Sequence, residues 1–294
     1  MISHVFNLIS VRTRAADFFE LTKFRLVSLV LLSTCAGYYL GSTGSFDFGR
    51  LIVTMLGTGL VAAGTMALNQ YAEKKEDSLM MRTMNRPIPT GRVQPHEAFI
   101  FGIVISLLGI AVLYFAINTA AAFLSALTLI TYILIYTPMK KQTPLCTAVG
   151  SVPDALPALV GWAAVKGNTS FGAWILFLII FVWQNPHFMA IAWMLRKDFQ
   201  AAGFKILSVS DPDGKQVGKQ IVYYSIALLP VSLLPTFFHL TGWIYFFGAL
   251  FLSSAFLWIA IKGWKKMDSS AKGIFRASII YLTLIFVLMF VNKA

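Results

Sequence analysis

The 294-residue sequence is poor in charged residues. Asp, Glu, Lys and Arg together make up 12% of the chain, whereas hydrophobic residues make up 57% and the mean hydropathy is +0.73. Soluble globular domains carry roughly a quarter charged residues, about twice as many as this chain. The shortage therefore excludes a soluble domain and indicates a polytopic membrane protein.

Cysteine is also scarce. The two cysteines, Cys35 and Cys146, lie in or beside apolar stretches and are far apart in the chain. A disulfide framework or a zinc site needs more cysteines at closer spacing, such as Cys-x-x-Cys. We therefore expect both residues to serve in packing.

Acidic residues are half as frequent as basic ones, with 12 Asp and Glu against 24 Lys and Arg. All the basic residues except Arg50, Lys166 and Lys293 fall before the first apolar stretch or in alternate loops. By the positive-inside rule, the N-terminus is cytoplasmic and the C-terminus lies on the outer side of the inner (plasma) membrane. Because the cations are spread over membrane-flanking loops, the charge argues against a nucleic-acid partner.

Long apolar runs recur along the chain, each close to the ~20 residues that cross a bilayer as a helix. They lie at about 26–45, 51–71, 97–117, 119–139, 145–165, 171–194, 219–239, 243–263 and 275–292. We predict an all-α polytopic membrane protein, with residues 1–294 forming one domain. Its nine transmembrane helices would surround a central cavity that opens near the cytoplasmic face. Residues 1–25 alternate charged and apolar positions, which predicts an amphipathic lead-in on the membrane surface.

A charged run follows the second apolar stretch. In a helix, Asn69, Glu73 and Asp77 would project from one face, one turn apart. Such oxygen ligands suit Mg²⁺, which is usually completed by substrate phosphate oxygens. Arg82 and Arg86 follow in the sequence, and their guanidinium groups could bind phosphate. The alternative is that these charges are a solvated cytoplasmic helix end.

Two further polar segments lie on the predicted cytoplasmic side or within a span. Lys140 and Lys141 follow the fourth span, where they could bind phosphate or simply anchor the helix at the interface. Asp154 lies inside the fifth span, where a carboxylate is costly in lipid and so should face a cavity or a partner.

The sixth span contains consecutive polar residues, Gln184 and Asn185, followed by a proline and His187. Polar residues inside a spanning segment usually mark a cavity or a substrate path. His187 and Asp198 are eleven residues apart, so a continuous helix would place both on one stripe with Trp183 and Met194. A lone histidine packed in the core is the alternative interpretation.

Together these motifs closely resemble the haem O synthases, or protoheme IX farnesyltransferases, a branch of the intramembrane aromatic prenyltransferases. The resemblance covers about residues 20–290. It rests on Asn69-x3-Glu73-x3-Asp77, Arg82-Thr83-x2-Arg86-Pro87-x3-Gly91, Tyr136-Thr137-x3-Lys141-x-Thr143 and Trp183-Gln184-x-Pro186-His187-Phe188. Glu73 stands where many members have Asp. Met194 and Ala202 reduce the family's second acidic motif to Asp198, which leaves a second metal site open.

The resemblance implies a Mg²⁺-dependent transfer of farnesyl from farnesyl diphosphate to a vinyl group of haem B, giving haem O with a hydroxyethylfarnesyl side chain. It also points to haem A synthase or terminal oxidase assembly factors as protein partners. The implied metal ligands are Asn69, Glu73, Asp77 and Asp198; the diphosphate ligands are Arg82, Arg86, Lys140 and Lys141; the haem-binding residues are Trp183, Gln184 and His187. Asn69, Glu73, Asp77, His187 and Asp198 are the implied catalytic residues.

Two other functions remain open from the sequence. A prenyltransferase for a quinone-head or chlorin acceptor would share the diphosphate motif without needing residues 183–187. A haem-binding membrane protein or a transporter would place ionisable residues near the middle of the bilayer. Here the carboxylates gather at one interface, which favours an enzyme.

Overall fold

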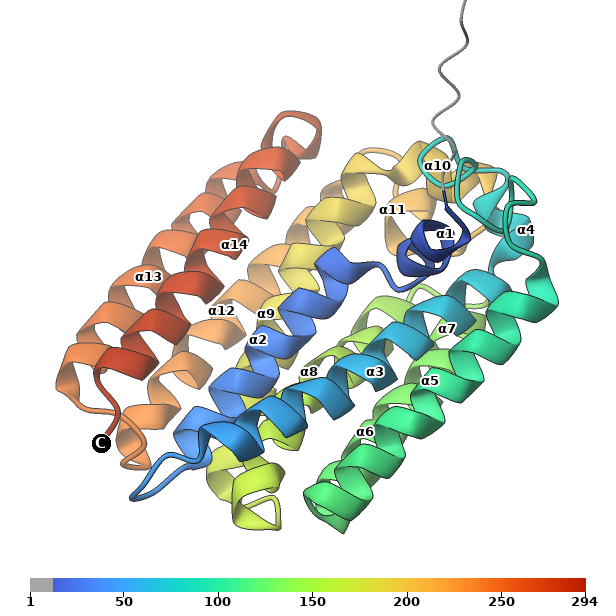
Figure 1. The fold of residues 1–294 in the computed structure, drawn as a ribbon. Helices are drawn as coiled ribbons and strands as arrows, with labels where there is room; N and C mark the ends of the chain where they lie inside the picture. The colour runs from blue at the N-terminus through green and yellow to red at the C-terminus, as the bar shows by residue number, and fades with distance from the viewer. Residues whose placement is uncertain (1–12) are drawn as a thin grey trace, which may run out of the picture.

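The computed structural model describes residues 13–294 as a bundle of helices (Figure 1). Within these residues nine segments are long and apolar enough to cross a membrane. Eight are single helices: α2 (Phe24–Gly41), α3 (Phe48–Ala72), α5 (Pro95–Ala116), α8 (Cys146–Lys166), α9 (Phe171–Met194), α12 (Lys215–Phe237), α13 (Trp243–Gly263) and α14 (Met267–Val291). The ninth, Thr119–Met139, consists of α6 (Thr119–Ile130), the π-helix η1 (Thr131–Tyr136) and α7 (Thr137–Met139). The predicted all-α fold with nine spans is confirmed.

Four short helices lie at one end of the bundle. They are α1 (Arg14–Leu21), α4 (Lys74–Asp77), α10 (Arg196–Ala201) and α11 (Leu207–Ser210). Figure 1 shows all four at the same end, whereas the C-terminus lies at the opposite end. The charged loops that the sequence assigns to one side of the membrane thus gather at one end of the molecule.

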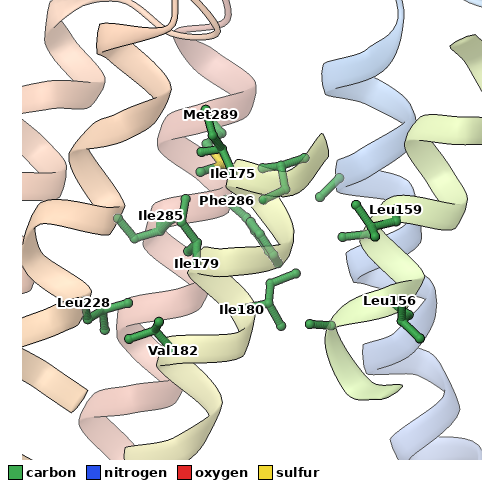
Figure 2. Close-up of a cluster of buried hydrophobic side chains, with 14 of the residues drawn as sticks. Leu156, Leu159, Ile175, Ile179, Ile180, Val182, Leu228, Ile285, Phe286 and Met289 are labelled. Carbon is green, nitrogen blue, oxygen red and sulfur yellow. The ribbon is translucent and has the colours of Figure 1, made fainter. Parts of the chain in front are cut away.

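Helices α8 and α9 form the interior of the bundle. Of their most apolar 18-residue windows, 72% and 61% of the residues are buried, more than in any other of the described spans. Figure 2 shows Leu156 and Leu159 of α8 on one side of α9, and Leu228 of α12 with Ile285 of α14 on the other. This position explains why α9 can carry polar residues, since much of its surface faces protein instead of lipid.

Helices α2 and α8 cross at a very short distance because glycine stands at both contact points. A Cβ atom on Gly161 would lie 1.9 Å from the carbonyl oxygen of Thr34, and one on Gly37 would lie 1.9 Å from that of Ala158. Small residues of this kind allow two membrane helices to pack backbone against backbone. The crossing fixes α8 against α2, and both helices line the cavity described below.

We expect Gly161→Ala to destabilise the protein, because the clash is with backbone and no side-chain rotation can relieve it. Overpacking of this kind costs about 1–3 kcal/mol or more. The matched control is Gly273→Ala in α14, where an added Cβ meets no atom within 4 Å. Thermal unfolding in detergent should show a lower midpoint for Gly161→Ala and no loss for Gly273→Ala; equal midpoints would contradict the close crossing.

The predicted lead-in is described only from residue 13 onward, and its first twelve residues lie outside the described part. Helix α1 is capped by Thr13, whose hydroxyl accepts a hydrogen bond from the Ala16 amide. Leu21 is fully buried, and its carbonyl accepts a hydrogen bond of 2.8 Å from the Gln70 side chain. The end of α1 is therefore held against α3. Its place on a membrane surface stays a prediction.

Candidate active site

One cavity of about 380 Å³ contains most of the residues that the sequence analysis selected. It lies between α2, α3, α8, α9, α14 and the α6–η1–α7 segment. Of the predicted site residues, those that line it are Asn69, Glu73, Asp77, Arg82, Arg86, Lys140, Trp183, Gln184 and His187. Residues from three distant parts of the chain thus meet in one chamber.

The three predicted metal ligands line the same cavity, although not on one continuous helix. Helix α3 ends at Ala72, and Glu73 forms a junction with non-helical angles (φ −99°, ψ 17°) before α4. The Glu73 amide still donates to the Asn69 carbonyl at 2.9 Å, and the Asp77 amide to the Glu73 carbonyl at 2.8 Å. These bonds preserve the one-turn spacing across the break, so the three side chains keep a common side.

These side chains are buried, so the alternative of a solvated helix end is wrong. Asn69, Glu73 and Asp77 are 1%, 5% and 1% exposed. Each meets a cation: Lys23 Nζ lies 2.9 Å from Asn69 Oδ1, Lys140 Nζ lies 2.7 Å from Glu73 Oε1, and Arg86 Nη1 lies 2.7 Å from both oxygens of Asp77. Although burial by itself would raise the pKa of Glu73, the adjacent Lys140 holds it below its ordinary value.

Lys23 is a cavity residue that the sequence analysis did not select. It stands just before α2 with a left-handed backbone (φ 49°), and its Nζ donates to Asn69 Oδ1. Burial, followed by the positive charge of Arg86, lowers the pKa of Lys23 to about 7. The positive-inside pattern accounted for this lysine as a membrane anchor, and nothing in its local sequence distinguished it from one. An anionic group in the cavity would stabilise its charged form.

The donor set fits Mg²⁺. A magnesium ion prefers oxygen ligands, and it commonly takes one or two carboxylates and completes its shell with substrate phosphate. Lys23 can donate only to an oxygen, so its bond identifies the Asn69 atom facing the cavity as the carbonyl oxygen. Within residues 13–294, no three His, Cys, Asp or Glu side chains are grouped so as to hold a metal. The ligands that fit are thus two carboxylates and one amide oxygen.

Two predicted site residues do not line the cavity. Helix α9 ends at Met194, and Leu195 forms a junction before α10 with nearly the same angles as Glu73 (φ −103°, ψ 16°). The Leu195 amide donates to the Ile191 carbonyl at 3.0 Å and the Phe199 amide to the Leu195 carbonyl at 3.1 Å, so the helical hydrogen bonds continue across this break. The stripe from His187 to Asp198 therefore stays a prediction. Lys141 is half-exposed and its Nζ pairs with Glu76 Oε1 at 2.5 Å. The roles predicted for Asp198 and Lys141 stay predictions, and neither residue lines the cavity, although the charge of Asp198 acts on Arg82.

Arg82 lines the cavity near several carboxylates without pairing with any of them. It forms no hydrogen bond or ion pair within the described residues, although the charges of Asp77, Asp198 and Glu73 act on it. Arg86, by contrast, is committed to Asp77 through both carboxylate oxygens. Arg82 is therefore free to meet an anionic ligand at the mouth, and a guanidinium matches phosphate geometry well.

His187 lies in the wall of the cavity that α9 and α14 form. Its ring stacks on Trp183, with centroids 4.8 Å apart and planes 23° from parallel. Its Nδ1 lies 2.7 Å from Ser278 Oγ, and that hydroxyl gives its one hydrogen to the Phe275 carbonyl. Ser278 must therefore accept from Nδ1–H, which leaves a lone pair on His187 Nε2. This tautomer suits ligation of iron or acceptance of a hydrogen bond.

Aromatic side chains from the π-helix complete the chamber. Tyr132 and Tyr136 both line the cavity, and their rings contact edge to face with centroids 5.1 Å apart. Lys140 lies 4.5 Å above the Tyr136 ring. The family motif had singled out Tyr136, whereas Tyr132, one turn earlier, was missed because it resembles an ordinary apolar position of a span. A π-helical turn at a functional site is a common arrangement.

Comparisons with known proteins identify the family of this chain. Residues 30–290 match the UbiA prenyltransferase family. The protoheme IX farnesyltransferase of Solibacter usitatus is 41% identical over 287 residues, covering 94% of this chain and 98% of the relative. That of Salinibacter ruber is 39% identical over 278 residues, covering 94% and 98%.

Solved structures show the same fold. A structure of digeranylgeranylglyceryl phosphate synthase has a TM-score of 0.80 at 18% identity, covering 95% of this chain and 98% of that one. A UbiA homolog from Archaeoglobus fulgidus bound to DMAPP and Mg²⁺ has a TM-score of 0.71 at 16% identity, covering 94% and 98%. By sequence and by fold, this chain belongs to the UbiA prenyltransferase family, and its curated relatives are protoheme IX farnesyltransferases.

Proposed function

We propose that this protein transfers a farnesyl group from farnesyl diphosphate to a vinyl group of haem B, and that the product is haem O. The observation that carries the proposal is one cavity, which joins the oxygen-rich and basic part formed by Asn69, Glu73, Asp77 and the cations to a wall that presents His187 with a free Nε2. The first part suits a diphosphate and the second suits a haem. The names of the curated relatives support both substrates.

The diphosphate would bind at the mouth of the cavity. Asn69, Glu73 and Asp77 would hold Mg²⁺, which would neutralise the negative charge that develops as the diphosphate leaves. The UbiA homolog from Archaeoglobus fulgidus is bound to DMAPP and Mg²⁺, which supports this assignment. Arg82 would bind phosphate oxygens directly. Lys140, now paired with Glu73, would move to the phosphate once a metal neutralises that carboxylate.

The allylic group would lie in the apolar part of the cavity, away from bulk solvent. Breaking the bond between C1 and the diphosphate oxygen leaves a cation that water would quench. Tyr132, Tyr136 and Phe188 line this region, and the faces of aromatic rings attract cations. These rings would hold the cation until the vinyl group attacks C1.

The haem would lie against α9 and α14. His187 Nε2 would ligate the iron or accept a hydrogen bond, and Ser278 would fix the ring that carries it. Trp183 is itself held in place, because its Nε1 donates to the Ser278 carbonyl at 2.7 Å. The stacked pair would therefore present a rigid, flat surface to the macrocycle.

We further propose a cytoplasmic N-terminus and a C-terminus on the outer side of the plasma membrane. The gathering of α1, α4, α10 and α11 at one end supports this orientation, because the basic loops then share the cytoplasmic side (Figure 1). Haem A synthase and terminal oxidase assembly factors would be the neighbouring proteins.

Removing the metal should stop the reaction without unfolding the protein. Purified protein is given farnesyl diphosphate and haem B in detergent, and haem O is measured with Mg²⁺ or with excess chelator. We expect product only with Mg²⁺, and recovery of activity when Mg²⁺ is added back to the chelated sample. Unchanged turnover in chelator would contradict the proposed role of the metal.

A further inference from the structure

Asp154 is a carboxylate in the cavity wall that the proposed diphosphate and haem sites leave unused. It lies within α8 and lines the cavity. Its Oδ2 accepts a hydrogen bond of 2.8 Å from Gln184 Nε2. Within residues 13–294 no cation pairs with it, and no hydrogen bond is made to its Oδ1. Every other carboxylate that lines the cavity is paired with a basic side chain.

Gln184 supplies a second unused acceptor at the same place. Only an amide nitrogen can donate to a carboxylate, so the bond to Asp154 fixes which end of the Gln184 side chain is nitrogen. The opposite atom, Oε1, is buried and has no hydrogen-bond partner among the described residues, and the residue as a whole is 7% exposed. Buried polar atoms are usually satisfied, so this oxygen is able to accept a hydrogen bond from an occupant that donates.

Asp154 and Gln184 both line the cavity, and each has one acceptor oxygen, Oδ1 and Oε1, without a hydrogen-bond partner among the described residues. A single small occupant that satisfies both oxygens must carry at least two hydrogens on a polar atom. The reactive parts of the two proposed substrates, an allylic chain and a vinyl group, have no such donor. Water does, and a polar site with several partners is where a cavity water is stable.

We propose that Asp154 and Gln184 hold the water molecule that adds to the prenylated vinyl group, and that Asp154 accepts its proton. The inference rests on the proposed function. Heterolysis of the C1–oxygen bond sends its electron pair to the diphosphate, and the terminal vinyl carbon then bonds to C1. The cation left on the inner vinyl carbon takes the oxygen lone pair of the water. One water proton passes to the Asp154 carboxylate, and the product gains a hydroxyl group.

The identity of the product tests this role better than the rate does. If no water is delivered, the cation loses a proton from the neighbouring carbon and gives an alkene that is lighter than haem O by one water molecule. Asp154→Asn keeps the size of the side chain and removes the base. Gln184→Met removes the second anchor of the water and leaves the carboxylate. Asp213→Asn is the matched control, because Asp213 is half-exposed and pairs with Lys215.

Each protein is incubated with farnesyl diphosphate, haem B and Mg²⁺ in water labelled with heavy oxygen, and the prenylated haems are separated by mass. We expect labelled haem O from the native protein and from Asp213→Asn, and a several-fold shift towards unlabelled alkene in both Asp154→Asn and Gln184→Met. If Asp154→Asn does not fold, Gln184→Met decides the result.

An unchanged ratio of hydroxylated product to alkene in the folded variants would overturn the inference, whatever their rates. So would a complete loss of C–C bond formation in a folded Asp154→Asn protein that binds both substrates, since this would place Asp154 before the water step. If the native protein prenylates no haem, the proposed function itself fails, and this outcome is distinct from the other two.

Discussion

Asp77→Asn is expected to lower farnesyl transfer by about a hundredfold to a thousandfold, which is typical of removing one electrostatic contact to a developing anion. Asparagine has the same shape as aspartate and can still accept a hydrogen bond from Arg86. It lacks the negative charge that a metal ligand needs at this position. We therefore expect the protein to remain folded and to bind haem B, while haem O formation at saturating Mg²⁺ falls.

Alanine is a poorer choice at this position because of the buried ion pair. The side chains of Asp77 and Arg86 are 1% and 18% exposed. Removing one partner of such a pair leaves the other charge buried and costs about 3–5 kcal/mol. A loss of activity in Asp77→Ala would thus mix unfolding with chemistry. Near-native turnover in folded Asp77→Asn at saturating Mg²⁺ would contradict the assignment of Asp77 as a ligand.

His187→Ala is expected to abolish haem O formation and to change the absorption spectrum of bound haem. Farnesyl diphosphate should still bind, because its ligands belong to α3, α4 and the loops that follow α4 and α7. If His187 were only a packed core residue, its loss would lower stability by about 1–3 kcal/mol, and activity would follow the folded fraction. We expect the opposite: His187→Ala should remain folded, form no haem O and show a changed spectrum of bound haem.

Ser278→Ala is the matched companion of that variant. It removes the acceptor that orients His187 Nδ1–H and leaves the imidazole itself in place. Loss of an orienting partner typically weakens a ligand's function about 10- to 100-fold. We expect an intermediate loss in Ser278→Ala and no further loss when it is combined with His187→Ala. Independent, additive effects of the two substitutions would argue that Ser278 does not act through His187.

The sequence was sufficient to predict the nine spans, because their apolar runs have the length that a bilayer requires. It was less informative about where the helices end. Helix α14 begins at Met267, eight residues before the predicted span, since a helix can continue through a polar turn outside the apolar run. Hydropathy detects the apolar core of a span and does not detect its hydrogen-bonded ends.

The relative positions of site residues could be predicted where they follow from the spacing of residues within one segment. Asn69, Glu73 and Asp77 keep their common side because the hydrogen bonds across Glu73 retain the helical spacing. The junction at Leu195 has nearly the same backbone angles and the same pattern of hydrogen bonds, from the Leu195 amide to the Ile191 carbonyl and from the Phe199 amide to the Leu195 carbonyl. Asp198 nevertheless does not line the cavity, and nothing in the apolar periodicity indicated this difference between the two junctions.

Contacts between distant segments could not be predicted. Lys23 reaches Asn69 across 46 positions, and Gln184 reaches Asp154 across 30. In the sequence, Lys23 resembles a membrane anchor and Asp154 resembles an isolated charge in a span. Their roles become apparent only once the fold places them in the wall of one cavity.

The most direct test of the account is the choice of acceptor. Purified protein is given farnesyl diphosphate and Mg²⁺ with equal concentrations of haem B and an aromatic quinone-head acceptor, and all prenylated products are identified by mass. The account predicts one product, haem B enlarged by one farnesyl group and one hydroxyl group. Prenylation of the quinone-head acceptor with haem B unchanged would contradict the account, since the cavity would then accept a quinone head and His187 would bind no haem.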